Sequence, residues 1–192
     1  MIAQATNITC RRGGRTLFYG LSLAIDAGQS LVIRGPNGIG KSSLLRMMAG
    51  LLPCAEGSID CIDEIAFSDE RAALDPERSV RDALGFWAGL DSGRNRLNEA
   101  IGALQLSGLA DVPVRMLSTG QRKRASLART IASGAKLWLL DEPGNGLDTA
   151  SLLALGSAIH AHVARGGGVI AASHFDLPHR FSLSLDLTDY RP

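Results

Sequence analysis

The 192-residue sequence carries almost no net charge and has no hydrophobic run long enough to cross a membrane. Its 20 lysine and arginine residues nearly balance 19 acidic residues, so no overall field marks the chain as a binder of nucleic acid. The longest stretch without charge, residues 149–164, contains two histidines and falls short of the ~20 apolar residues that a spanning helix needs. We therefore expect neither a nucleic-acid partner nor a direct membrane span.

Cysteine and lysine are both scarce. The three cysteines are an odd number without the spacing of metal ligands, which is typical of ordinary thiols in a reducing compartment. Only Lys41, Lys123 and Lys136 accompany 17 arginines, so the position of each lysine is informative. Hydrophobic residues make up 45% and charged residues 20%, a balance that argues against a disordered chain.

The length fits a single domain over residues 1–192, large enough to bury a core without disulfides or a structural metal. Alternating or apolar segments predict strands, and segments with apolar residues on one face predict helices. Their order predicts an α/β fold with a mostly parallel core sheet, antiparallel strands at the N-terminus and a helical insert. The predicted strands are residues 3–10, 21–25, 29–33, 58–62, 65–67, 136–140, 169–172 and 182–187, and the predicted helices are residues 41–52, 94–106, 118–133 and 149–165.

A glycine-rich loop follows the third predicted strand. Residues 35–42 read GPNGIGKS and match the pattern GxxxxGK[ST] between a strand and a helix, a context that disfavours a chance glycine turn. Glycines let consecutive N–H groups face a phosphate, and the positive end of the next helix adds to the attraction. Lys41 reaches the terminal phosphates, and Ser42 can ligate Mg²⁺. The predicted nucleotide-binding residues are Gly35, Pro36, Asn37, Gly38, Ile39, Gly40, Lys41, Ser42 and Ser43.

A second part of the site is predicted far along the chain. Residues 137–142 read LWLLDE, an apolar strand ending in two carboxylates. Ligands collect beyond the carboxyl ends of parallel strands. If this strand neighbours the one before Gly35, Asp141 lies near Ser42 and holds Mg²⁺, directly or through water, while Glu142 polarises an attacking water. Two acids after a strand form a solvated turn in many proteins, but the P-loop favours the catalytic interpretation.

Residues 117–121 read LSTGQ and stand shortly before the carboxylate strand, where Ser118 and Gln121 also fit a helix capping box. The order of P-loop, LSTGQ and LWLLDEP resembles the ATP-binding cassette (ABC) ATPases over nearly the whole chain. The resemblance implies a P-loop NTPase fold and an ATPase that uses ATP and Mg²⁺. It also implies two lobes, a nucleotide-binding core of residues 1–68 and 135–192 and a helical lobe of residues 69–134.

The same resemblance implies a homodimer in which two chains enclose two ATP molecules head to tail. Ser118, Gly120 and Gln121 of one chain then meet the γ-phosphate that the P-loop of the other chain holds, with the helix N-terminus aimed at the phosphate. His174 matches the histidine that contacts the γ-phosphate and the water. The implied catalytic residues are therefore Glu142, His174 and Lys41.

Two positions depart from the family pattern. Arg12 stands where the family has an aromatic residue that stacks on adenine, and arginine stacks on a base less reliably. Glu70, or alternatively Asp69, stands where the family has a glutamine that links Mg²⁺ to the helical lobe. A carboxylate at this position can still bind the ion, so Glu70 is a candidate metal ligand beside Ser42 and Asp141.

Within the ABC family, the chain resembles the ATP-binding subunits of bacterial haem exporters of cytochrome c maturation, by its short length and by residues 15–29 and 117–143. This implies integral membrane permease subunits as partners, a peripheral place at the cytoplasmic face of the inner membrane, and haem as cargo of the complex only. Two alternatives stay open: a soluble ABC ATPase of translation or cluster assembly, and a nucleotide-binding regulatory module with little turnover. A small-molecule P-loop kinase is disfavoured, because LSTGQ would then serve no purpose.

Overall fold

The computed structural model describes residues 1–70, 73–91 and 93–192. The strands are β1 (Ala3–Arg12), β2 (Arg15–Ile25), β3 (Ser30–Arg34), β4 (Glu56–Cys61), β5 (Ile65–Ser68), β6 (Leu137–Asp141), β7 (Gly168–Ala172) and β8 (Leu183–Asp186). The α-helices are α1 (Lys41–Met48), α2 (Val80–Leu90), α3 (Leu97–Ala103), α4 (Thr119–Ser133) and α5 (Thr149–Ala164).

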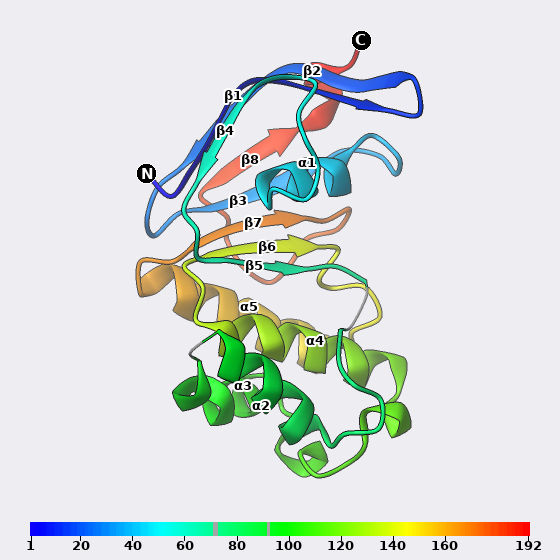
Figure 1. Ribbon diagram of the computed structural model, residues 1–192, viewed down its shortest axis with the longest axis vertical. Coiled ribbons are helices and arrows are strands. Elements are labelled where there is room, and N and C mark those ends of the chain that lie inside the picture. Colours follow the sequence, from blue (N-terminus) through cyan, green and yellow to red (C-terminus); the bar gives the residue numbers. More distant parts are fainter. Residues whose placement is uncertain (71–72, 92) are drawn as a thin grey trace.

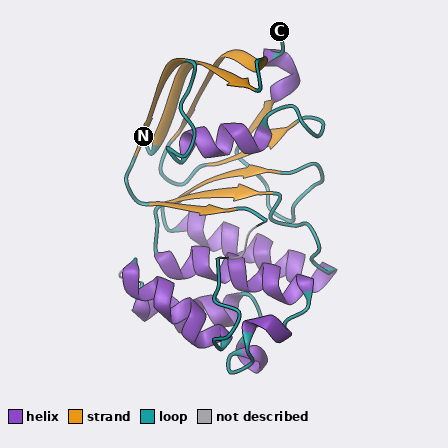
Figure 2. Cartoon of the chain, turned by 45° about the vertical axis from the view of Figure 1, so that its right-hand side comes forward, coloured by secondary structure: helices purple, strands orange, loops and turns teal. Residues whose placement is uncertain are grey.

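Two sheets and a helical layer are stacked along the long axis of the molecule (Figure 1). The central sheet has the order β5-β6-β7-β3-β8, and all of its recorded pairings are parallel. The second sheet, β2-β1-β4, is antiparallel. Helix α1 lies between the two sheets, and the other helices gather on the opposite face of the central sheet (Figure 2). The predicted α/β fold, with a parallel sheet, N-terminal antiparallel strands and a helical insert, is confirmed.

The alternation of side chains along the central strands explains this layering. In β6, Leu137 and Leu139 pack into the core around α1, whereas Trp138 and Leu140 pack against the helices on the other face. Strand β7 alternates in the same way. Because both faces of a parallel sheet are covered, its strands consist of nearly continuous apolar residues, as the sequences LWLLD and GVIAA show.

The helical insert packs against the face of the central sheet that is turned away from α1. Helices α2, α3 and α4 surround buried leucines, isoleucines, valines and alanines, and these form one cluster with residues of α5, β6 and β7, separate from the core between the two sheets. Helix α4 begins at a capping box, in which Ser118 accepts from the N–H of Gln121 and the Gln121 side chain accepts from the N–H of Ser118. It ends at Gly134, whose left-handed conformation terminates the helix. The division into two lobes, residues 1–68 with 135–192 and residues 69–134, stays a prediction, because one hydrophobic cluster contains residues of both.

The predicted elements are close to those observed, with three differences. The sequence predicts no separate helix over α2, because two glycines, Gly85 and Gly89, weaken its helical pattern. Strand β2 begins at Arg15, and pairing with β1 extends the strand through residues without clear alternation. The segment predicted as helix 94–106 is a short 3₁₀ turn followed by α3.

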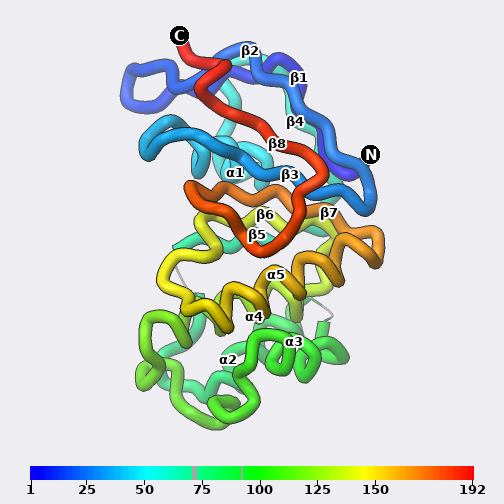
Figure 3. The backbone as a smooth tube through the Cα atoms, turned by 180° about the vertical axis from the view of Figure 1, so that it is seen from behind, coloured from blue at the N-terminus to red at the C-terminus, as the bar shows by residue number. Residues whose placement is uncertain are grey.

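The chain passes behind the sheet after β7 before it returns as the edge strand β8 (Figure 3). This return segment is anchored to the start of β3, where the Ser30 hydroxyl and His179 Nε2 lie 3.0 Å apart. The return segment also lies close to α5, since a Cβ atom added at Gly156 would come within 2.1 Å of the Pro178 carbonyl oxygen. The contact holds the segment that carries His174 against the sheet.

This close approach gives a stability test with a matched control. Gly156→Ala in α5 should lower the free energy of unfolding by about 1–3 kcal/mol, because the backbone of Pro178 cannot accommodate a methyl group. Gly102→Ala in α3 should raise it by up to about 1 kcal/mol, because a Cβ atom there meets open space and alanine favours the helix. Urea denaturation measures both, and equal effects of the two substitutions would contradict the packing described.

Candidate functional site

The glycine-rich loop between β3 and α1 forms a phosphate-sized cradle. Gly35, Gly38 and Gly40 adopt φ values of 130°, 81° and 119°, which residues other than glycine rarely adopt. A Cβ atom on Gly40 would also lie 3.1 Å from the Phe18 ring. Gly40 is the N-cap of α1 and offers no side chain to its first N–H groups. These N–H groups, together with the helix dipole, therefore favour an anionic ligand.

Lys41 lies over the same loop and is only 6% exposed. Its ammonium donates hydrogen bonds to the carbonyl oxygens of Gly35, at 2.8 Å, and Pro36, at 3.3 Å. It also lies 3.8 Å from Oε1 of Glu142. The ammonium is thus held beside the cradle, within reach of a group that binds there.

Asp141 and Ser42 lie together as the sequence predicts, although their two strands are not neighbours in the sheet. The Ser42 hydroxyl donates a 3.0 Å hydrogen bond to Oδ1 of Asp141. The strand pairing supposed to bring them together is wrong, because β7 lies between β6 and β3. All three strands end at the same edge of the sheet, so Asp141 reaches Ser42 across one intervening strand. Burial raises the pKa of the Asp141 carboxyl, and the hydrogen bond from Ser42 acts against this shift.

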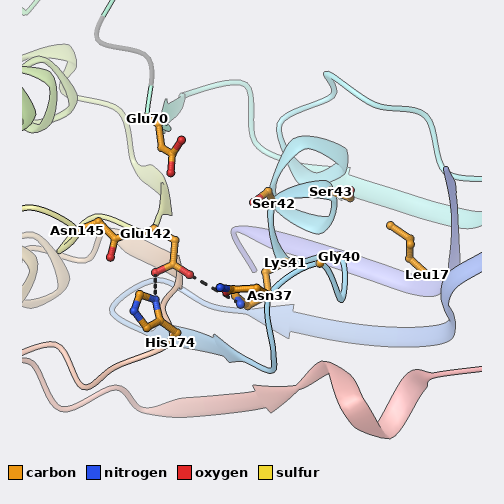
Figure 4. Close-up of a pocket in the computed structure, with 11 residues that line it drawn as sticks. Leu17, Asn37, Gly40, Lys41, Ser42, Ser43, Glu70, Glu142, Asn145 and His174 are labelled. Atoms are coloured by element: carbon orange, nitrogen blue, oxygen red, sulfur yellow. Dashed lines mark hydrogen bonds and ion pairs between the residues drawn. The ribbon is translucent and has the colours of Figure 1, made fainter. Parts of the chain in front are cut away.

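Glu142 follows β6 in a left-handed conformation with φ 45°, which is strained for a residue with a side chain. Its carboxylate lies between two nitrogen groups (Figure 4). Besides the Lys41 ammonium, Nδ1 of His174 lies 2.8 Å from its Oε2 atom. His174 is half exposed, so its other ring nitrogen is accessible to a ligand. The strained turn therefore places a carboxylate and an imidazole side by side at the mouth of the loop.

These groups line a pocket of about 360 Å³ (Figure 4). Its lining also includes two residues that the sequence analysis missed: Leu17 of β2 and Asn145 of the loop after β6. Leu17 lies in the part of β2 that has no clear alternation and Asn145 lies in a turn, and neither position carries a local signal of ligand binding. The lining residues are Leu17, Asn37, Gly38, Gly40, Lys41, Ser42, Ser43, Glu70, Glu142, Asn145 and His174.

Some predicted site residues lie elsewhere. Arg12 stands exposed at the end of β1 and does not line the pocket, whereas Leu17 of the facing strand does. An alignment by motif selects a position along the chain, but strand pairing decides which side chain faces the loop. Glu70 lies in the pocket lining as predicted, on the same side as Glu142 and Asn145 (Figure 4).

The LSTGQ segment is also outside this pocket. Ser118 and Gln121 form the capping box of α4, and neither they nor Gly120 line the pocket. A Cβ atom on Gly120 would lie 2.9 Å from the carbonyl oxygen of Gly146, so this helix start abuts the loop that carries Asn145. Within one chain, α4 therefore begins beside the nucleotide pocket, and its N-terminus is not part of the pocket lining.

The donor groups fit a magnesium ion that shares its ligands with a substrate. No cluster of three or more His, Cys, Asp or Glu side chains arranged to hold a metal occurs in residues 1–70, 73–91 and 93–192. The pocket instead offers one hydroxyl, Ser42, hydrogen-bonded to one buried carboxylate, Asp141. Mg²⁺ characteristically binds one or two protein oxygens together with phosphate oxygens and waters. The residues therefore fit Mg²⁺ bound jointly with a triphosphate.

A phosphate cradle, a lysine over it and paired carboxylates at the end of a parallel strand define a P-loop nucleoside triphosphatase. The sequence pattern of the ABC transporter family matches residues 18–145. The chain belongs to the ABC transporter family, as an ATP-binding and ATP-hydrolysing subunit.

Several known proteins are similar to this chain over most of its length. It is 53% identical over 171 residues to the cytochrome c biogenesis ATP-binding export protein CcmA of Sphingopyxis alaskensis, covering 88% of each chain. It is 50% identical to the protein of the same name from Novosphingobium aromaticivorans, covering 98% of this chain and 96% of the other. An ABC transporter ATP-binding protein of Pyrococcus furiosus, 24% identical, has the same fold, with a TM-score of 0.86 and 99% coverage of both chains.

Within the described ranges, none of the helices is both long and apolar enough to cross a bilayer.

The pocket lining gives a test of base recognition. Leu17→Ala should weaken ATP binding severalfold, because Leu17 supplies apolar surface to the pocket and truncation removes about 1–2 kcal/mol of contact. Arg12→Ala should change the dissociation constant less than about twofold, because the exposed Arg12 does not line the pocket. Calorimetric titration with ATP measures both dissociation constants. A larger loss of affinity for the Arg12 variant than for the Leu17 variant would support the predicted stacking of Arg12 on adenine.

Proposed function

We propose that this chain is the ATPase subunit of a membrane complex that exports haem, or releases a haem-loaded chaperone, in cytochrome c maturation. The observation that carries the ATPase part is the convergence of Lys41, Ser42, Glu142 and His174 on one pocket, with Asp141 hydrogen-bonded to Ser42. The cytochrome c part is supported by relatives named as cytochrome c biogenesis ATP-binding export proteins. Haem is then cargo of the complex, not a ligand of this chain.

The geometry supports a division of tasks. The N–H groups of the P-loop and the Lys41 ammonium bind the β- and γ-phosphates. Ser42 and Asp141 would hold Mg²⁺, which when bound neutralises charge on the phosphate oxygens. The carboxylate of Glu142 orients and polarises the attacking water, because it lies beside Lys41 and is held by His174. His174 stabilises the γ-phosphate through its exposed ring nitrogen.

We further propose a head-to-tail homodimer. The start of α4, with the exposed Ser118 of its capping box, lies beside the pocket but outside its lining. A second copy turned head to tail would bring Ser118, Gly120 and Gln121 against the γ-phosphate held by the first. This arrangement supplies positive potential from a helix N-terminus at the one side of the phosphate that a single chain leaves open.

The complex would also contain integral membrane permease subunits. Members of the ABC transporter family act with such subunits, and the relatives above are named export proteins. We therefore place the chain at the cytoplasmic face of the inner membrane, bound through its partners. The export names of the relatives favour this function over a role in translation or cluster assembly.

The roles of Lys41 and Glu142 separate in binding and turnover measurements. Lys41→Ala should weaken ATP binding by about 100-fold, because one buried ammonium is lost beside the phosphates. Glu142→Gln should retain binding and lower steady-state phosphate release by about 100-fold or more, because the amide cannot polarise water. Phosphate release at unchanged rate in the Glu142 variant would show that another group activates the water.

A mixing experiment tests the dimer. Chains with Lys41→Ala and chains with Ser118→Arg should each be inactive alone, whereas an equal mixture should recover about a quarter of the wild-type rate of phosphate release. Half of the mixed dimers are heterodimers, and each of these has one intact site built from the P-loop of one chain and the signature segment of the other. No recovery on mixing would indicate that both segments act within one chain.

A further inference from the structure

A second cavity adjoins the nucleotide pocket on the side of the helical layer. It has a volume of about 490 Å³ and shares Glu70 and Asn145 with the nucleotide pocket. Its other wall is the first part of α4. Two side chains of opposite charge, Glu70 and Lys123, therefore face one space between the end of β5 and the start of α4. The complete lining is Glu70, Thr119, Arg122, Lys123, Ser126, Asn145 and Gly146.

Glu70 is the acid at this edge of the sheet without a described partner. Asp141 accepts a hydrogen bond from Ser42, Glu142 lies beside Lys41 and His174, and Asp69 lies 3.5 Å from Arg46. In the described part of the chain, no hydrogen bond or ion pair engages the Glu70 carboxylate. With Mg²⁺ held by Ser42 and Asp141, the exposed Glu70 carboxylate adds negative charge to the pocket lining, and this charge opposes the binding of a triphosphate.

Lys123 is the complementary group. Its side chain is partly buried, and no hydrogen bond or ion pair to it occurs among the described residues. Burial lowers the pKa of Lys123, while the nearby carboxylates of Asp141, Glu70, Asp69 and Glu142 oppose the shift by stabilising the ammonium form. The chain has only three lysines, and this one stands on α4 in the lining of the cavity that Glu70 also lines.

We propose that Lys123 is a positioning residue for nucleotide binding, which forms an ion pair with Glu70 across the shared cavity and so compensates its charge when Mg·ATP occupies the site. The inference rests on the proposed ATPase function and deepens it. It assigns to α4 of the same chain a role besides presenting its N-terminus to a partner copy. Lys123 acts on the nucleotide through Glu70, without touching a phosphate.

The test is a double-substitution cycle on binding of the non-hydrolysable analogue AMP-PNP with Mg²⁺, measured by calorimetry. Lys123→Met should weaken binding by about tenfold, because the negative charge of Glu70 then stays uncompensated beside the triphosphate. Lys123→Arg should stay within about twofold of wild type. Glu70→Gln with Lys123→Met should bind within about threefold of Glu70→Gln alone, because the charge that Lys123 compensates is then absent.

Lys136→Met is the matched control, because Lys136 is exposed and paired with Glu64 away from the pocket. It should leave the dissociation constant unchanged. If Lys123→Met fails to fold by circular dichroism, Lys123→Gln replaces it in the cycle.

The outcomes distinguish the inference from the function on which it rests. If wild-type protein binds AMP-PNP and Lys123→Met binds it as tightly as Lys136→Met does, the proposed role of Lys123 is overturned. The proposed ATPase function is then unaffected. The loss of affinity caused by Lys123→Met can also be the same in the Glu70→Gln background as in wild type. This result would show that Lys123 contacts the phosphates directly, and it would overturn the proposed pairing with Glu70. Wild-type protein that binds no nucleotide overturns the ATPase function and the inference together.

Discussion

Ser42 and Asp141 are separated by 99 positions in the chain, yet the hydroxyl of one lies 3.0 Å from the carboxylate of the other. This contact depends on one constraint, namely that β3, β7 and β6 run parallel and end at the same edge of the sheet. Within one chain, the groups proposed to bind the phosphates, to hold Mg²⁺ and to activate the water come from that edge or from the start of α1. A change in strand order or direction would disperse the groups, even with each motif intact.

The constraint is met by burial on both faces. The core around α1 holds β3 and β7 from one side, and the helical layer holds β6 and β7 from the other. Such burial resists movement of the strands, so the carboxylates of Asp141 and Glu142 are held where a phosphate can use them. The surrounding packing maintains the strained backbone of Glu142. Its N–H donates a hydrogen bond to the Ala172 carbonyl, which also holds it in place.

The helical layer contributes in two ways to a site that it does not form. The N-terminus of α4 lies beside the pocket, where we propose that a second copy uses it, and the same helix carries Lys123, which lines the adjoining cavity together with Glu70. Glu70 stands between these elements and lines both cavities. The helical layer shares one hydrophobic cluster with a face of the central sheet, and charged side chains at this boundary line the cavity next to the nucleotide pocket.

The sequence by itself determined the α/β class, the phosphate loop and the identity of the two acids, because these features are local. A left-handed glycine turn, an apolar strand and a helix start each depend on a few consecutive residues. Strand order, the selection of Leu17 over Arg12 as a lining residue, and the opposition of Glu70 to Lys123 were decided only by the tertiary structure. These depend on pairing and packing between distant segments, whose energies are summed over the whole core and leave no pattern in any one stretch of chain.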